Sequence, residues 1–184
     1  MTTPTQSLAY CTPAQYLDQF GASEATMLLQ DEERTLEQAW LVALVNGSTS
    51  DLSTLRAPQL AVADSALARL NRALTESKNL IDGYLRSAGL ALPLSDEQIG
   101  QTPLITCNAV LARCWLMDDS DNATELAEKR CEKERAWLRD IATKKVSLFA
   151  NDAASAIGAS ANEVRHGRVP SDFDHGSKWS GYPS

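Results

Sequence analysis

Histidine is nearly absent from the sequence. His166 and His175 are the only two in 184 residues, and both stand near the C-terminal end. Asp172 and Asp174 lie close to them, so the four side chains have the chemistry of a metal site, but we favour a solvated pair of histidines. The sequence also has no phosphate-binding loop, no dinucleotide fingerprint and no set of nucleophile, base and acid. We therefore expect no enzyme activity, no cofactor and no metal.

Long apolar runs are missing too. No window approaches the roughly 18 consecutive apolar residues of a membrane span, and the N-terminus has neither a basic start nor an apolar signal core. These absences predict a protein that is made and used in a cytoplasm.

Closely spaced cysteines are also missing. None of the four cysteines forms a CxxC pair, and all lie inside or beside apolar helical patterns: Cys11, Cys107, Cys114 and Cys131. This arrangement favours reduced thiols in the core over a disulfide framework or a zinc site.

An excess of positive charge is absent from most of the chain. The 17 Lys and Arg residues are outnumbered by 24 Asp and Glu residues, which gives a net charge of -7. A generally basic surface that coats nucleic acid is thereby excluded. Residues 124–145 are the one basic segment, with seven bases against five acids. An excess of two charges is typical of a solvated helix face and does not indicate DNA binding.

Helix signals, in contrast, are abundant, and no strand pattern competes with them. Thr12 is placed to cap a first helix, with Pro13 at its first position, Gln15 completing a capping box and Gly21 ending it. A second short helix is expected over 23–30. A third runs through Leu36, Trp40, Leu41 and Leu44 to a stop at Asn46 and Gly47, and STSDLST at 48–54 is expected to be a loop.

Three longer helices are expected in the second half of the chain. The strongest pattern marks one apolar face from Leu60 to Leu85 and ends at Gly89. Ser95 and Gln98 are expected to cap a short turn. Another helix starts at Thr102 and Pro103, and a charged one follows from a capping pair at Asn122 and Glu125; the tryptophans Trp40, Trp115 and Trp137 are expected to pack in the core. The predicted fold is all-α, a small antiparallel bundle of three longer helices with short N-terminal ones.

The segment LALPL, which follows Gly89, is unexpectedly apolar for a loop. Two interpretations remain open for Leu90, Leu92, Pro93 and Leu94. The residues form a contact with another subunit, or they fold back over the helix ends as a buried loop.

The segment after Val146 differs in composition from the helical part of the chain. It is rich in small residues, Gly and Ser, yet it carries Phe173, Trp179 and Tyr182. Because disordered tails normally lack aromatic residues, whereas docking segments use them as anchors, we predict a partner-binding arm. The predicted organisation is a helical domain over 1–148 and an extended arm over 149–184.

Four blocks of sequence resemble the Mu-like phage head-to-tail joining family, which is similar to the adaptor proteins of long-tailed phages. They are YCTPAQYLDQFG, IDGYLRSAGLALPL, PLITCNAVLARCWL and AEKRCEKERAWLRDIATKKVSL. The resemblance covers 60–148 and the first twenty residues. Gln19 stands where the family usually has arginine, and Ala88 and Gly89 replace an arginine–tyrosine pair. Residues 31–58 are longer than usual, and the chain after Leu148 does not align.

The resemblance implies a structural role without a reaction. Copies would form a ring, implied to be twelvefold, beneath the portal protein at the neck of the virion after assembly in the host cytoplasm. The ring would receive the next connector (stopper) or tail protein, and DNA would pass through its lumen without sequence-specific binding. The alternative is a small helical regulator that binds a protein partner through its aromatic tail. Finding the protein in mature particles would separate the two.

Overall fold

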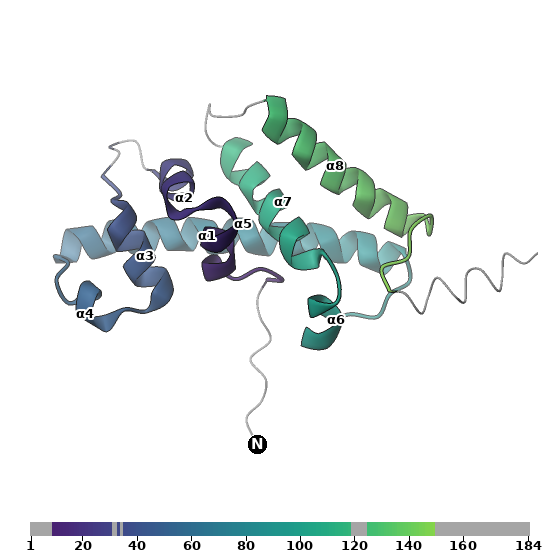
Figure 1. Ribbon diagram of the computed structural model, residues 1–184, viewed down its shortest axis with the longest axis horizontal. Coiled ribbons are helices and arrows are strands. Elements are labelled where there is room, and N and C mark those ends of the chain that lie inside the picture. Colours follow the sequence, from purple (N-terminus) through teal and green to yellow (C-terminus); the bar gives the residue numbers. More distant parts are fainter. Residues whose placement is uncertain (1–8, 31–32, 34, 119–124, 150–184) are drawn as a thin grey trace, which may run out of the picture. The chain divides into compact units, whose positions relative to one another are not determined.

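The computed structural model describes residues 9–30, 33, 35–118 and 125–149. These residues form eight α-helices and no strand, so the all-α prediction is confirmed (Figure 1). None of the described helices combines the length and the hydrophobicity that a membrane span needs. In chain order the helices are α1 Pro13–Phe20, α2 Ala22–Leu29, α3 Gln38–Asn46, α4 Thr49–Leu52, α5 Ala57–Ser87, α6 Asp96–Gly100, α7 Leu104–Asp118 and α8 Glu125–Ala142.

The first helix begins and ends where local chemistry requires. The backbone N–H of Thr12 donates to the side-chain oxygen of Gln15 at 2.8 Å, and the N–H of Gln15 donates to the Thr12 hydroxyl at 3.2 Å. This reciprocal pair satisfies two of the free N–H groups at the start of α1. Gly21 ends the helix with a φ of 86°, a value that glycine adopts without a steric penalty. The chain therefore turns sharply into α2.

The prediction of a loop at STSDLST was wrong in part. Gly47 ends α3 in the left-handed conformation as expected, but residues Thr49–Leu52 then form the short helix α4. The Ser48 hydroxyl donates to the Asp51 carboxylate at 2.6 Å, and the Thr54 hydroxyl donates to the Asp51 carbonyl at 2.6 Å. Serine, threonine and aspartate thus supply local hydrogen bonds that hold one helical turn in a segment of loop-like composition.

The long helix α5 is the structural spine. Its 31 residues bury one face along almost the whole length, from Ala63 to Leu85. Close packing against α7 is possible because both helices present alanines to the shared core, including Ala66, Ala73 and Ala109. Small side chains let two helix backbones approach closely, so the α5–α7 pair forms the centre of the fold.

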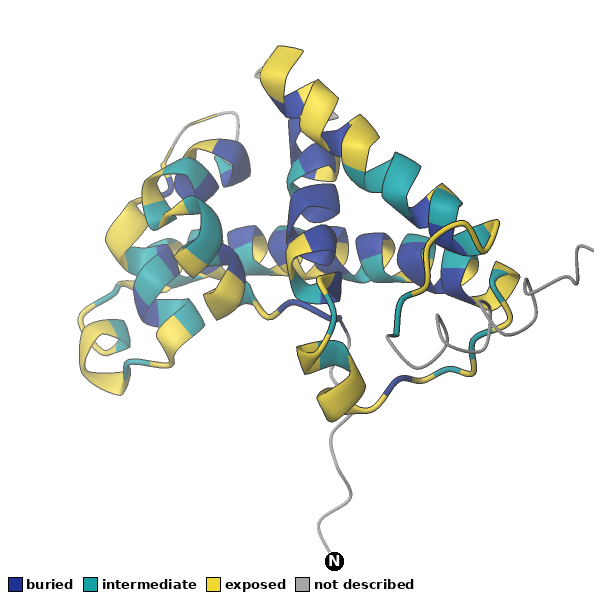
Figure 2. Cartoon of the chain, turned by 45° about the vertical axis from the view of Figure 1, so that its right-hand side comes forward, coloured by how far each residue is buried: buried dark blue, intermediate teal, exposed yellow. Residues whose placement is uncertain are grey.

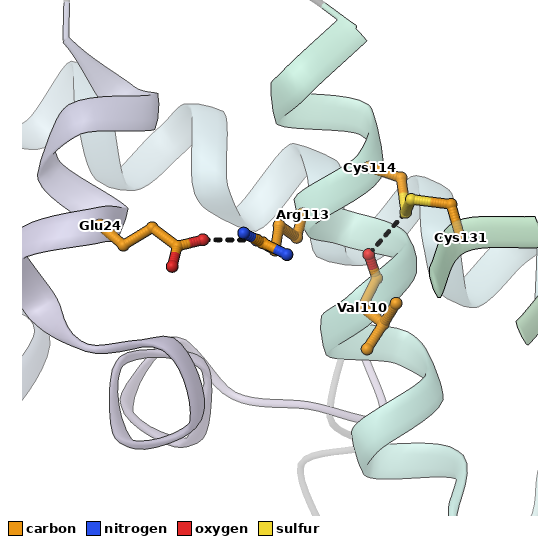
Figure 3. The surroundings of a disulfide bond; sticks show 5 residues. All are labelled: Glu24, Val110, Arg113, Cys114 and Cys131. Atoms are coloured by element: carbon orange, nitrogen blue, oxygen red, sulfur yellow. Dashed lines mark hydrogen bonds and ion pairs between the residues drawn. A yellow bond between two sulfur atoms is a disulfide. The ribbon is translucent and has the colours of Figure 1, made fainter. Parts of the chain in front are cut away.

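Helices α7 and α8 run in opposite directions and cross α5 (Figure 1). Most of α7 is buried, as its dark blue colour shows in Figure 2, whereas α8 exposes the face directed away from the other helices. A disulfide between Cys114 and Cys131 joins the two helices (Figure 3). The prediction of four reduced thiols was therefore wrong for this pair, while Cys11 and Cys107 are free and buried as expected.

The Cys114 sulfur also lies 2.9 Å from the carbonyl oxygen of Val110 (Figure 3). A reduced thiol would donate a hydrogen bond to this carbonyl. In the disulfide the sulfur carries no proton, so the approach is a contact only.

Two large hydrophobic clusters stabilise the described domain. The first joins α1, α2 and α3 to the N-terminal half of α5 and to one side of α7 around Tyr16, Leu41 and Leu70. The second joins the C-terminal half of α5 to α7 and α8 around Ile81, Leu104 and Leu138. Because α5 and α7 contribute to both clusters, these two helices connect the two ends of the domain.

The short segment before α1 is attached to this core by a buried amide. Asn108 of α7 is fully buried, and its side-chain oxygen accepts from the backbone N–H of Cys11 at 2.8 Å. Its side-chain nitrogen donates to the carbonyl of Leu74 in α5 at 3.0 Å. One side chain thus links the N-terminal segment, α5 and α7.

A second polar link starts at Tyr10, the residue before Cys11 in the N-terminal segment. The hydroxyl of Tyr10 donates to the buried carboxylate of Asp82, which also pairs with Lys78 at 2.6 Å. The Lys78 ammonium lies 5.3 Å from the centre of the Tyr10 ring. Burial and the neighbouring Asp82 carboxylate raise the pKa of Tyr10 well above its usual value of 10. The neutral phenol therefore remains a hydrogen-bond donor throughout the physiological range.

Candidate functional site

The described residues do not form a cluster of metal-ligating or nucleophilic side chains. No group of three or more His, Cys, Asp or Glu is placed there to hold a metal ion. The two free thiols are buried, and burial raises the pKa of Cys11 to about 12. Burial, followed by the nearby Glu134 carboxylate, raises the pKa of Cys107 still further. A thiol that stays protonated is a poor nucleophile, so neither cysteine has the properties of a catalytic residue.

These shifts predict that the native protein resists thiol reagents. A rise of the Cys11 pKa from 9.0 to about 12 lowers the thiolate fraction near pH 8 about a thousandfold, and burial slows access further. We expect labelling of Cys11 and Cys107 by a disulfide reagent to be at least that much slower in the native state than in urea. Stopped-flow absorbance gives the labelling rate, and peptide mapping shows which cysteine has reacted. Labelling of the native protein at the rate of free cysteine would contradict the prediction.

Exposed apolar side chains are the more informative feature. Four large ones stand out among the described residues: Met27, Trp115, Leu126 and Val146. Trp115 is 46% exposed, so the expectation that it packs in the core was wrong. Trp40 and Trp137 are half-buried and pack against the first and second clusters. An exposed tryptophan on an otherwise buried helix marks a surface that can bind a partner.

Trp115 lines a groove of about 660 Å³ between α5 and α7, which we call the α5–α7 groove. Arg69, Arg72 and Glu76 line it from α5, with Ala73 and Leu116 completing the lining. The groove therefore combines an aromatic surface with charged groups on one wall.

The two arginines differ in whether their guanidinium groups already have partners. The guanidinium of Arg69 donates to the carbonyl of Gln30 at 3.1 Å and, more weakly, to that of Leu29 at 3.5 Å, which satisfies the C-terminal end of α2. Arg72 is exposed and has no hydrogen-bond or ion-pair partner in the described part of the chain. Glu76 stands one turn further along α5 without an ion pair to Arg72. Arg72 thus presents an unpaired positive charge next to Trp115.

A second groove of about 440 Å³ lies between α2 and α7, lined by Phe20, Met27, Arg113 and Met117 among others. Its charges are already paired, because Arg113 forms an ion pair with Glu24 (Figure 3). The Arg113 guanidinium also lies 5.2 Å from the centre of the Phe20 ring. Since its two charged side chains are paired with each other, this groove offers less to a charged partner than the α5–α7 groove.

The LALPL segment is placed against the domain itself. Leu94 is buried, and Leu90 and Leu92 are half-buried against the second cluster, while Pro93 is exposed after a cis peptide bond. Gly89 has a φ of 87°, which turns the chain back at the end of α5. This packing gives the leucines an internal partner. Their contact with another subunit stays a prediction.

The predicted arm residues Phe173, Trp179 and Tyr182 lie outside the described residues, as do His166 and His175. The capping residue Asn122 lies outside them too. Trp115, Arg69 and Arg72, which form the groove, were not among the predicted site residues.

The family model described as "Bacteriophage Mu, Gp36" matches residues 10–166. The chain belongs to this family of phage proteins, in agreement with the resemblance of its sequence blocks. The match continues beyond Leu148, so the first part of the segment that did not align also belongs to the family sequence. No curated protein matches the chain. No solved structure matches it either.

Proposed function

We propose that the protein is a structural connector subunit of a phage particle. Copies assemble as a ring beneath the portal protein and join the DNA-filled head to the next connector or tail protein. The observation that carries this proposal is the match to the Gp36 family of bacteriophage Mu over residues 10–166. The coarser part, membership of a phage protein family, holds independently of the connector role.

The described domain has features that suit a binding role. Its exposed apolar residues and the unpaired Arg72 favour contact with other proteins. Its deeply buried thiols, whose pKa is raised by burial, support our proposal that it is not an enzyme. In this role the net charge of -7 reduces adhesion to DNA that passes through the ring.

The direct test is light scattering coupled to size-exclusion chromatography. The full chain is run alone and then with the portal protein encoded by the same phage genome. We expect a defined complex that carries several copies of the chain per portal ring. A folded protein that ignores the portal and is absent from mature particles would contradict the connector role and favour the helical regulator instead.

Removal of the arm should separate folding from attachment. We expect deletion of residues 172–184 to leave the helical fold intact, because the described helices end at Ala142, and to prevent portal binding because Phe173, Trp179 and Tyr182 are lost. Circular dichroism and thermal melting report on the fold, and the portal complex reports on attachment. If the shortened protein still joins heads to tails, the arm has no role in attachment.

A further inference from the structure

The α5–α7 groove has the features of a binding site for a peptide segment in which an aromatic residue stands between two acidic residues. Trp115 provides an apolar surface, and Ala73 leaves space beside it because its side chain is only a methyl group. Arg72 provides an unpaired positive charge at one edge, and Arg69 adds a second charge even though its N–H groups also bind α2. Arginine pairs well with carboxylates and stacks on aromatic rings.

The sequence contains one segment of that kind. Phe173 stands between Asp172 and Asp174, and it is the only aromatic residue in the chain with an acid on both sides. A phenyl ring against Trp115 leaves two carboxylates to pair with arginine. Charge and shape thus point to the same occupant.

We propose that the segment Asp172–Asp174 of one copy binds the α5–α7 groove of a second copy. The proposal rests on the ring assembly proposed above and names its contact. Arm and groove are different surfaces, so each copy can give an arm and receive one, which is the head-to-tail contact that closes a ring. Charge pairing and aromatic contact make this contact specific for the acidic segment.

The chain is long enough for this exchange. Phe149, where the described domain ends, and Phe173 are 24 positions apart in the sequence, and a fully extended chain of that length spans at most about 85 Å. Helix α5, the longest element, measures about 46 Å at 1.5 Å per residue. A segment of this length can therefore reach from its own domain to a neighbouring copy.

The first test is the binding of a labelled synthetic peptide, Arg168–Lys178, to the full-length protein. The receptor carries Phe173→Ala so that its own arm does not compete. We expect fluorescence anisotropy to show saturable binding that weakens with added salt, because exposed charge pairs are screened. Arg72→Glu and Trp115→Ala should each lower the affinity at least tenfold. Lys133→Glu changes the net charge equally on exposed α8 and should leave the affinity unchanged.

A charge exchange then identifies the partner of Arg72. The peptide carrying D172K and D174K should bind the Arg72→Glu receptor better than the original receptor. Equal affinity of the original peptide for both receptors, or no binding to either, would overturn the proposal.

Mixing distinguishes a second copy from the same chain. In the full-length protein, Arg72→Glu and the double variant D172K/D174K each prevent the contact. When the two variants are mixed, each arm fits only the other variant's groove, so light scattering at increasing concentration should show association in the mixture and not in either variant alone. Peptide binding without association in the mixture would assign the segment to its own chain and overturn the exchange.

The peptide-binding and mixing experiments do not involve the portal protein, so they test the contact between copies separately from the connector role. Loss of the peptide contact with normal portal binding would remove this inference and leave the connector role. Peptide binding and restored association in a protein that ignores the portal would keep the contact between copies and remove the connector role.

Discussion

Reduction of the Cys114–Cys131 disulfide should lower the free energy of unfolding by about 3 kcal/mol. The bond connects residues 17 apart in the sequence across the α7–α8 pair, and cross-linking a loop of this size removes about that much conformational freedom from the unfolded chain. Urea unfolding followed by circular dichroism, with and without a reducing agent, measures the difference.

Cysteine variants provide the controls. Cys131→Ala should be destabilised to a similar extent, and its stability should no longer respond to the reducing agent. Cys11→Ala should still respond, because Cys11 is a free thiol. Identical unfolding curves of the original protein under oxidising and reducing conditions would show that the bond does not stabilise the fold.

Replacement of Asn108 by alanine should be comparably destabilising. The substitution leaves the backbone N–H of Cys11 buried without its acceptor and removes the donor to the Leu74 carbonyl. A buried polar group without a partner costs about 1–3 kcal/mol, and the truncated side chain also leaves a cavity. Equilibrium unfolding in urea gives the difference in free energy.

Asn79→Ala is the matched control, since Asn79 is exposed on α5 and no hydrogen bond of its side chain is recorded within the described residues. Its effect should stay within about 0.5 kcal/mol. Asn108→Leu keeps a side chain of similar volume but has no polar atoms. If this variant is as stable as the original protein, packing and not the amide explains the position of Asn108.

Helix positions could be predicted from the sequence because their signals are local. The capping boxes at Thr12 and Ser95 involve residues three apart, and each forms as expected. Gly21, Gly47 and Gly89 each adopt a positive φ and end or interrupt a helix where the pattern stops. Such features depend on a few neighbouring residues and are visible in the sequence itself.

The disulfide and the groove could not be predicted in this way. Cys114 and Cys131 lie on different helices, and only the packing of α7 on α8 brings them within 6.2 Å between Cα atoms. Trp115 follows the apolar spacing of α7, but spacing does not reveal which face of a helix the other helices leave uncovered. Arg72 is one of many charged residues on α5, and its unpaired state depends on the fold.

The link through Asn108 also bears on the order in which the chain folds. Cys11 and Asn108 are 97 residues apart, whereas the α7 and α5 positions that Asn108 joins are 34 apart. Because closing a longer loop costs more entropy, we expect α5 and α7 to pair before the N–H of Cys11 reaches Asn108. The N-terminal segment is thus expected to attach last. The exchange of the Cys11 amide hydrogen then reports whether the centre of the domain has formed, although the residue itself lies near the chain's beginning.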